Sequence, residues 1–268
     1  MRRQLLLCLL GLLLSCLPVS HAQSNTELVQ VIPPPMRHAE PPPATSSMEE
    51  LESRADELRA QKAYLDALDY YRAVLARNPK NGTIWNKSGI VELQLHRYRE
   101  AKRDFDRAIH INRESADAYN NLGVVWYLQK KYVGAIKEYQ RAIKLRPDSA
   151  SYYSNLGAAY FSKKEFERAT FAYNEAVRLD PTVFEHSSQN GVSAQTTSLE
   201  DRAHFEYVLA KLFAKQGDSD RSLQYLKRAM EEGYKGIDQV YKDPDFEQLR
   251  SDARFTELMA SRPPAIPE

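Results

Sequence analysis

The chain has 268 residues, of which 43% are hydrophobic and 27% are charged, a composition that allows one or two globular domains with a sizeable core. The formal net charge of +1 lacks the excess of positive charge that nucleic-acid-binding proteins carry, so we expect no nucleic acid partner. A mean hydropathy of −0.58 excludes a polytopic membrane protein, because only one apolar run is present. Glycine is scarce (10 residues) and tyrosine abundant (16 residues), which argues against glycine-rich nucleotide-binding folds.

Residues 1–22 have the pattern of a secretory signal peptide. Two arginines precede an apolar run from Leu5 to Leu14, and small residues at positions 20 and 22 favour cleavage before Gln23. The apolar run is too short to span a membrane. We therefore expect an exported protein, either periplasmic or secreted.

An alternative reading of the same segment is a lipoprotein signal. Residues 13–16 resemble a bacterial lipobox, in which Cys16 would be lipidated and the protein would be an outer-membrane lipoprotein acting in pilus or envelope assembly. Membrane contact is expected only in that case. Both cysteines of the chain, Cys8 and Cys16, lie in this segment, so a chain beginning at Gln23 has no thiol chemistry and no cysteine-based metal site. Removal of Arg2 and Arg3 leaves 35 basic against 36 acidic residues, a net charge of −1.

Residues 23–47 are predicted to be a proline-rich linker. Six of the 14 prolines form the runs 33–35 and 41–43. Consecutive prolines favour extended polyproline II, so the segment is expected to be a semi-rigid spacer. A proline-recognition motif is the alternative interpretation.

From residue 48 the chain repeats with a period of 34 residues, which gives four units at about 48–81, 82–115, 116–149 and 150–183 within a block at 48–181. The units share a small residue, an alanine and an aromatic residue at fixed positions: Ala55, Gly89, Gly123 and Gly157; Ala67, Ala101, Ala135 and Ala169; Tyr71, Phe105, Tyr139 and Tyr173. Pro79, Pro147 and Pro181 close three of the units.

Each unit is expected to form two amphipathic helices, because its apolar residues recur at the spacing of one helix face. Small residues such as Gly123 and Ala135 let the two helices approach closely, while Tyr139 and Trp126 are expected to fill the space between units. One pair of helices cannot bury its apolar face alone, so the units must stack.

The complete pattern is found in the third unit: Tyr119, Leu122, Gly123, Trp126, Ala135, Tyr139, Ala142 and Pro147. It resembles the tetratricopeptide repeat, which has the same period. The resemblance implies an all-α fold, a right-handed α-α superhelix of about five helix pairs. The first unit departs from the pattern at Leu51 and Arg54, which is typical of a terminal capping repeat.

A degenerate fifth unit is predicted at 201–236, where Leu209, Ala210 and Phe213 restore the spacing. A polar insertion at 182–200 precedes it, and we interpret this as either a surface loop or a lid. A peptide or glycan binder that uses residues 182–197 is an alternative function. Short closing helices and a tail are expected at 237–268.

In tetratricopeptide repeat proteins the first helices of successive pairs line a concave groove that receives peptides or partner helices. The resemblance therefore implies a scaffold or adaptor whose partner is a protein or peptide segment. The candidate partner-binding residues, taken from the corresponding positions of each unit, are Asn86, Lys87, Ile90, Asn120, Asn121, Val124, Tyr127, Ser154, Asn155, Phe161, Tyr207 and Lys211. Their amides are suited to pair with an extended backbone, and they are equally suited to satisfy groups within the repeat.

Two more specific site types are not predicted. The Lys-Asn-Asn-Lys-Arg clamp of chaperone-binding repeats is incomplete here, because Val124, Ser154 and Ala158 occupy positions where the clamp has polar residues. Lys211 and Lys215 lie one turn apart and are suited either to an acidic ligand or to plain solvation. The histidines show no zinc-ligand spacing, and no nucleophile motif or phosphate loop is present, so we expect no enzyme, no metal and no cofactor.

Overall fold

The computed structural model describes residues 40–185 and 199–262, all of which belong to one compact unit, 37–268. The predicted signal peptide with Cys16, most of the proline-rich spacer and the greater part of the polar insertion lie outside these residues. All regular structure in the described ranges is helical.

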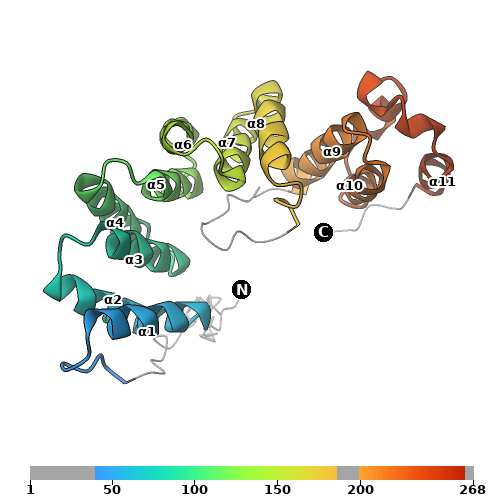
Figure 1. The fold of residues 1–268 in the computed structure, drawn as a ribbon. Helices are drawn as coiled ribbons and strands as arrows, with labels where there is room; N and C mark the ends of the chain where they lie inside the picture. The colour runs from blue at the N-terminus through green and yellow to red at the C-terminus, as the bar shows by residue number, and fades with distance from the viewer. Residues whose placement is uncertain (1–39, 186–198, 263–268) are drawn as a thin grey trace, which may run out of the picture. The chain divides into compact units, whose positions relative to one another are not determined.

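Ten α-helices follow one another as five pairs (Figure 1). The pairs are α1 (Met48–Ala60) with α2 (Tyr64–Arg77), α3 (Gly82–Gln94) with α4 (Tyr98–Ile111), α5 (Ala116–Leu128) with α6 (Tyr132–Leu145), α7 (Ala150–Ser162) with α8 (Phe166–Leu179), and α9 (Leu199–Lys215) with α10 (Ser219–Glu231). Three short 3₁₀ helices, η1 (Ile237–Tyr241), η2 (Pro244–Phe246) and η3 (Leu249–Ser251), precede α11 (Ala253–Ser261). The expected all-α architecture of about five stacked helix pairs is confirmed.

The turn inside each pair has the same backbone conformation. Lys62, His96, Lys130 and Lys164, which are spaced by the repeat period, all have a positive φ between 58° and 63°. A left-handed residue at this position lets the backbone N–H groups after the helix bond to its last carbonyls. The N–H of Lys131, for example, donates to the carbonyl of Trp126 over 2.9 Å. In the fifth pair Gly217 takes the left-handed position, with φ 77°, at no steric cost.

Close contact within a pair depends on the small residue of the first helix. The rings of Phe105, Tyr139 and Tyr173 lie directly against Gly89, Gly123 and Gly157, and all three rings are buried. The aromatic side chain of each second helix therefore packs on the glycine of its own pair.

Neighbouring pairs contact each other in two ways. The second helix of one pair packs on the first helix of the next, as α2 does on α3, α4 on α5 and α6 on α7. First helices also touch one another, α3 against α5 and α5 against α7. Aromatic rings join the fourth pair to the fifth, where Phe205 lies 5.3 Å from Tyr173 and 5.7 Å from Phe184 between ring centroids. Phe184, which the sequence places in the polar insertion, thus packs against the core.

The first pair is capped and holds the end of the spacer. Ser47 and Glu50 form a capping box, with the Oγ of Ser47 accepting from the N–H of Glu50 at 3.1 Å and the N–H of Ser47 donating to Glu50 at 2.8 Å. Arg77 of α2 donates to the carbonyls of Ala44 (2.9 Å) and Ser46. The last residues of the predicted spacer therefore lie along α2.

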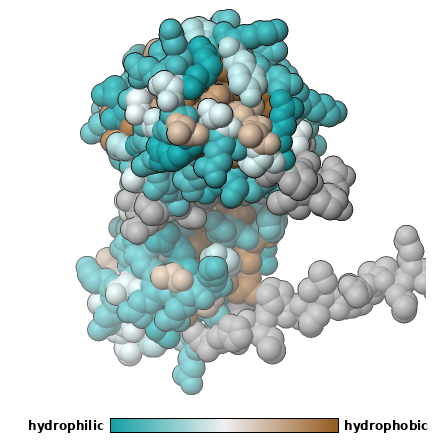
Figure 2. Space-filling model, turned by 90° about the vertical axis from the view of Figure 1, so that its right-hand side faces the viewer, coloured by the Kyte–Doolittle hydropathy of each residue, from teal (hydrophilic) through white to brown (hydrophobic). Residues whose placement is uncertain are grey.

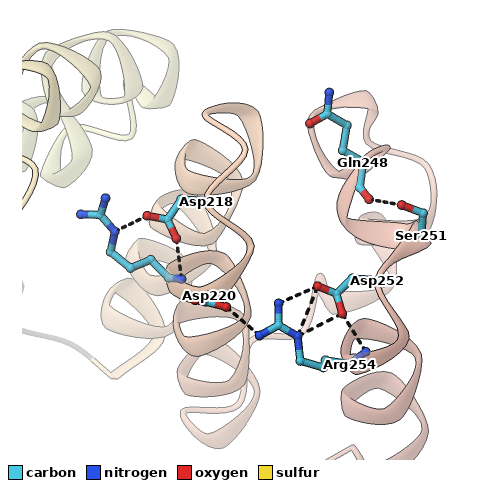
Figure 3. A network of polar contacts seen from close by, with 7 residues as sticks. Asp218, Asp220, Gln248, Ser251, Asp252 and Arg254 are labelled. Carbon is cyan, nitrogen blue, oxygen red and sulfur yellow. Dashed lines mark hydrogen bonds and ion pairs between the residues drawn. The ribbon is translucent and has the colours of Figure 1, made fainter.

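The C-terminal helices pack on the fifth pair. Arg254 at the start of α11 pairs with Asp220 of α10 at 2.6 Å and with Asp252 at 2.7 Å (Figure 3). Phe246 of η2 and Leu249 of η3 are buried. Hydrophilic side chains dominate the face shown in Figure 2, where hydrophobic ones gather in small patches. No helix in the described ranges is long and apolar enough to cross a membrane.

Candidate functional site: the first-helix face

We call the twelve predicted partner-binding residues, which lie on α3, α5, α7 and α9, the first-helix face. Four of these residues are joined by a directed chain of side-chain amides. Asn155 donates from Nδ2 to Oδ1 of Asn120 at 3.0 Å, Asn120 donates to Asn121 at 3.3 Å, and Asn121 donates to Asn86 at 3.1 Å. The chain connects α7, α5 and α3, and the first helices of three successive pairs therefore form one continuous polar seam.

The predicted residues differ in their exposure. Those that are buried are Asn120, Asn121, Val124, Tyr127, Asn155, Phe161 and Tyr207. Those that are half-buried and retain accessible surface are Asn86, Lys87, Ile90, Ser154 and Lys211. Contact of these twelve residues with a partner stays a prediction, and the half-buried members are the ones whose side chains already reach the surface.

Lys87 is held by the first pair. Its Nζ donates to Glu52 of α1 at 2.7 Å and to Asp56 at 2.6 Å. Burial lowers the pKa of Lys87, but the hydrogen bonds to Asp56 and Glu52 outweigh this effect and the net pKa is raised. Lys87 therefore stays protonated, and its charge is largely compensated by two carboxylates that the sequence pattern did not single out.

The two predicted aromatic anchors, Tyr127 and Phe161, lie at the junctions between pairs. The hydroxyls of Tyr127 and Ser162 are 3.0 Å apart and join α5 to α7. The ring centroid of Phe161 lies 5.2 Å from that of Phe166 and 5.2 Å from that of His204. Burial, followed by the nearby charge of Lys164, lowers the pKa of His204, so this imidazole is neutral at neutral pH.

In the fifth pair, two predicted residues contact the closing segment of the chain. Lys211 pairs with Asp243 at 2.7 Å and with Asp245 at 3.3 Å. Tyr207 stacks on Tyr234 at 4.5 Å and lies 5.6 Å from the ring of Phe246. Lys211 therefore pairs with carboxylates of its own chain and not with an acidic ligand, whereas Lys215, one turn further on, is exposed. The sequence signal that could have indicated this contact is the run Asp243-Pro244-Asp245-Phe246.

The described ranges contain no group of three or more histidine, cysteine, aspartate or glutamate residues placed to hold a metal ion.

Comparison with known proteins identifies the repeat. Profiles described as TPR repeat and tetratricopeptide repeat match residues 53–95, 125–164 and 150–183. The chain contains tetratricopeptide repeats. The matched segments cover parts of the first, second, third and fourth units, and the glycine–aromatic contacts described above follow the same period. No protein with curated annotation matches the chain in sequence.

Solved structures with tetratricopeptide repeats are similar in fold. PilF of Pseudomonas aeruginosa is 17% identical, with 81% of this chain and 83% of that chain covered and a TM-score of 0.51. MamA of Desulfovibrio magneticus RS-1 is 18% identical, with coverages of 69% and 94% and a TM-score of 0.49. YrrB, described as a TPR protein with an unusual peptide-binding site, is 18% identical, with coverages of 73% and 92% and a TM-score of 0.47. At these identities the similarity concerns the fold alone.

Proposed function

We propose that this tetratricopeptide repeat protein is an exported scaffold that binds a protein or peptide segment on its first-helix face. Tetratricopeptide repeats serve as scaffolds for protein–protein interaction and generally lack catalytic activity of their own. The observation that carries the proposal is the amide chain from Asn155 to Asn86, which links α7, α5 and α3 and ends at the half-buried Asn86. Half-buried residues of the same register, Ile90 and Ser154, are placed to contact a partner.

The chemistry of this face suits a polypeptide. The seam ends on α3 at Asn86, whose amide is half-buried and can both donate and accept, as the backbone of an extended peptide requires. Ile90 lies one turn further along α3 and offers apolar surface to a partner. The aromatic rings of Tyr127 and Phe161 are buried and pack between the helices that form this face. Affinity would then come from a few apolar anchors and specificity from the polar groups around them.

Site-specific photocrosslinking tests the proposal. A photoreactive phenylalanine analogue placed at Ile90 or Ser154 should form discrete adducts with a partner in envelope extracts. The matched control is Lys144, an exposed residue of the second helix α6, which should give none. Adducts of the same pattern and yield from all three positions would refute binding at the first-helix face.

The location of the protein is part of the proposal. The signal-like residues 1–22 support export, with either cleavage before Gln23 or lipidation at Cys16. Labelled palmitate incorporation that disappears in Cys16→Ser would establish the outer-membrane lipoprotein alternative, with a role in pilus or envelope assembly. An N-terminal sequence beginning at Gln23, with no label incorporated, would establish the periplasmic or secreted form.

A further inference from the structure

Two cavities of similar size lie at equivalent junctions between second helices. One, of about 390 Å³, is found where α2 meets α4 and is lined by Arg72, Trp85, Ser88, Arg103, Asp104 and Arg107. The other, of about 370 Å³, lies where α6 meets α8, and its lining includes Gln140, Tyr153, Leu156, Phe171 and Ala172. The second set stands two repeat periods after the first five residues of the first set. The two cavities are therefore the same site in different units of the array.

An arginine covers the aromatic floor of this site in two of the three units. The guanidinium carbon of Arg107 lies 5.8 Å from the ring centroid of Trp85. One period later, that of Arg141 lies 5.7 Å from the ring centroid of Tyr119. The acid three residues earlier is Asp104 in the first case and Glu138 in the second, and Glu138 pairs with Arg141 at 2.9 Å. The repeat thus has its own built-in ligand for this site, an arginine over an aromatic ring.

The fourth unit lacks this cover. Glu175 stands at the position of the arginine and Ala172 at the position of the acid. The carboxylate of Glu175 is held by Arg178 of the same helix at 2.9 Å. No cation in the described ranges lies over the ring of Tyr153, and the neighbouring Phe171 is 67% exposed. The ring of Tyr153 is therefore left uncovered beside the apolar residues Leu156, Phe171 and Ala172, and the lining also contains Gln140, Glu167 and Arg168.

We propose that this pocket binds an arginine side chain presented by a partner protein. The guanidinium would lie over Tyr153 as Arg107 lies over Trp85, and its aliphatic stem would pack on Phe171. Glu167, which lines the pocket, supplies negative charge at the rim.

The other cation at the pocket leaves room for this ligand. Arg168 also lines it, but its guanidinium pairs with Glu165 at 2.9 Å and lies 5.7 Å from the ring of Tyr160. Its charge is therefore compensated, and the ring that it covers, Tyr160, lines the same pocket, while the ring of Tyr153 is left for the ligand. The pocket uses α7 together with the second helices α6 and α8, but its lining does not include the first-helix-face residues Ser154, Asn155 and Phe161 of α7, so failure of the pocket and failure of the first-helix face can be told apart.

A titration followed by ¹H–¹⁵N NMR of the full chain tests the proposal. The probe is the blocked tripeptide acetyl-Gly-Arg-Gly-amide, compared with the same peptide carrying citrulline or norleucine. We expect saturable shifts confined to α6, α7 and α8, and binding of the citrulline peptide weaker by about five-fold because citrulline is neutral. Equal binding of the three peptides, or an absence of saturable shifts at these helices, would overturn the proposal.

Variants at one position complete the test. In Glu175→Arg the helix regains its own arginine, which should cover Tyr153 and abolish the peptide-induced shifts while the melting temperature is kept or raised. In Glu175→Gln the helix gains no arginine to cover Tyr153, so binding should persist within a few-fold of the parent. Unchanged binding in Glu175→Arg, with an intact spectrum, would contradict the assignment of the pocket.

Discussion

The ring of Tyr139 lies so close to Gly123 that an ideal Cβ atom on the glycine would stand 2.5 Å from Cε1 of the tyrosine. The contact joins the two helices of the third pair, and both residues are buried. Gly123→Ala must therefore push the ring or the helix aside. We expect a loss of about 1–3 kcal/mol in the free energy of unfolding, as overpacked cores show, measured by urea denaturation.

Gly134→Ala is the matched control for that substitution. Gly134 also lies inside a helix, α6, but its added Cβ would meet Trp126 at 3.4 Å, at the edge of ordinary contact. Because alanine is the better helix former by about 1 kcal/mol, this variant should be neutral or more stable. A loss equal to that of Gly123→Ala would mean that crowding against the ring is not the cause.

The amide seam makes Asn120 a structural residue as well as a candidate site residue. Asn120→Ala removes the acceptor of Asn155 and the donor to Asn121 in a buried setting. Buried polar groups left without a partner cost about 1–3 kcal/mol, so we expect a loss of that order in chemical denaturation. Asn174→Ala, at a half-buried position of α8, is the control and should change stability by less than about 0.5 kcal/mol.

Lys211 is expected to anchor the closing segment. Lys211→Ala leaves the carboxylates of Asp243 and Asp245 without their cation. Because the pair is partly exposed, the expected loss is small, about 0.5–1 kcal/mol, and local. Hydrogen exchange should quicken at η2, whereas Lys215→Ala, one turn away, should leave it unchanged. Identical exchange in both variants would show that the ion pairs do not hold the segment.

Glu206 of α9 gives the fold a dependence on pH. Burial raises its pKa to about 7, while Arg228 and Arg202 lower it and Glu232 raises it further. The folded state therefore retains this proton where the unfolded chain has lost it. The stabilising contribution of protonated Glu206 to the free energy of unfolding is fully present below the usual carboxyl pKa of about 4.5. It is lost as the pH rises from about 4.5 to about 7.

Thermal denaturation of Glu206→Gln as a function of pH measures this contribution. The variant should melt about 2–4 °C higher than the parent at pH 8 and match it near pH 4. Glu200→Gln, an exposed position of the same helix, serves as the control and should follow the parent at every pH. A parent-like profile for Glu206→Gln would assign the dependence to other groups.

The sequence predicts the architecture because its determinants are local. A glycine, an aromatic residue and a closing proline at fixed spacing each impose one feature of a helix pair, as Gly123, Tyr139 and Pro147 show. The period also places Asn121 and Asn155 in equivalent positions, but it does not say whether their amides face a ligand or other side chains. The hydrogen bond from Asn155 to Asn120, 35 residues away, is a property of how closely α5 and α7 pack.

Features that break the period were not accessible from the pattern. Lys211 meets Asp243 because the closing segment turns back on α9, and nothing in a 34-residue spacing encodes that return. Phe184 packs against Tyr173 although it begins a segment whose composition is polar. The sequence shows that Glu175 stands where the two preceding units have arginine. Only the structure shows that those arginines cover aromatic rings, and that the corresponding ring in the fourth unit is therefore uncovered.

The contacts from one first helix to the next link residues 35 positions apart, as Asn86 with Asn121 and Asn120 with Asn155. Such hydrogen bonds join only neighbouring units, so they do not depend on the number of repeats in the array. Duplication of residues 116–149 would therefore lengthen the seam by one step without new chemistry. The terminal pairs differ, because α1 begins with a capping box and α9 is covered by the closing segment. We therefore expect gene duplication to add repeats between the first and the fifth pair and not at the ends of the array.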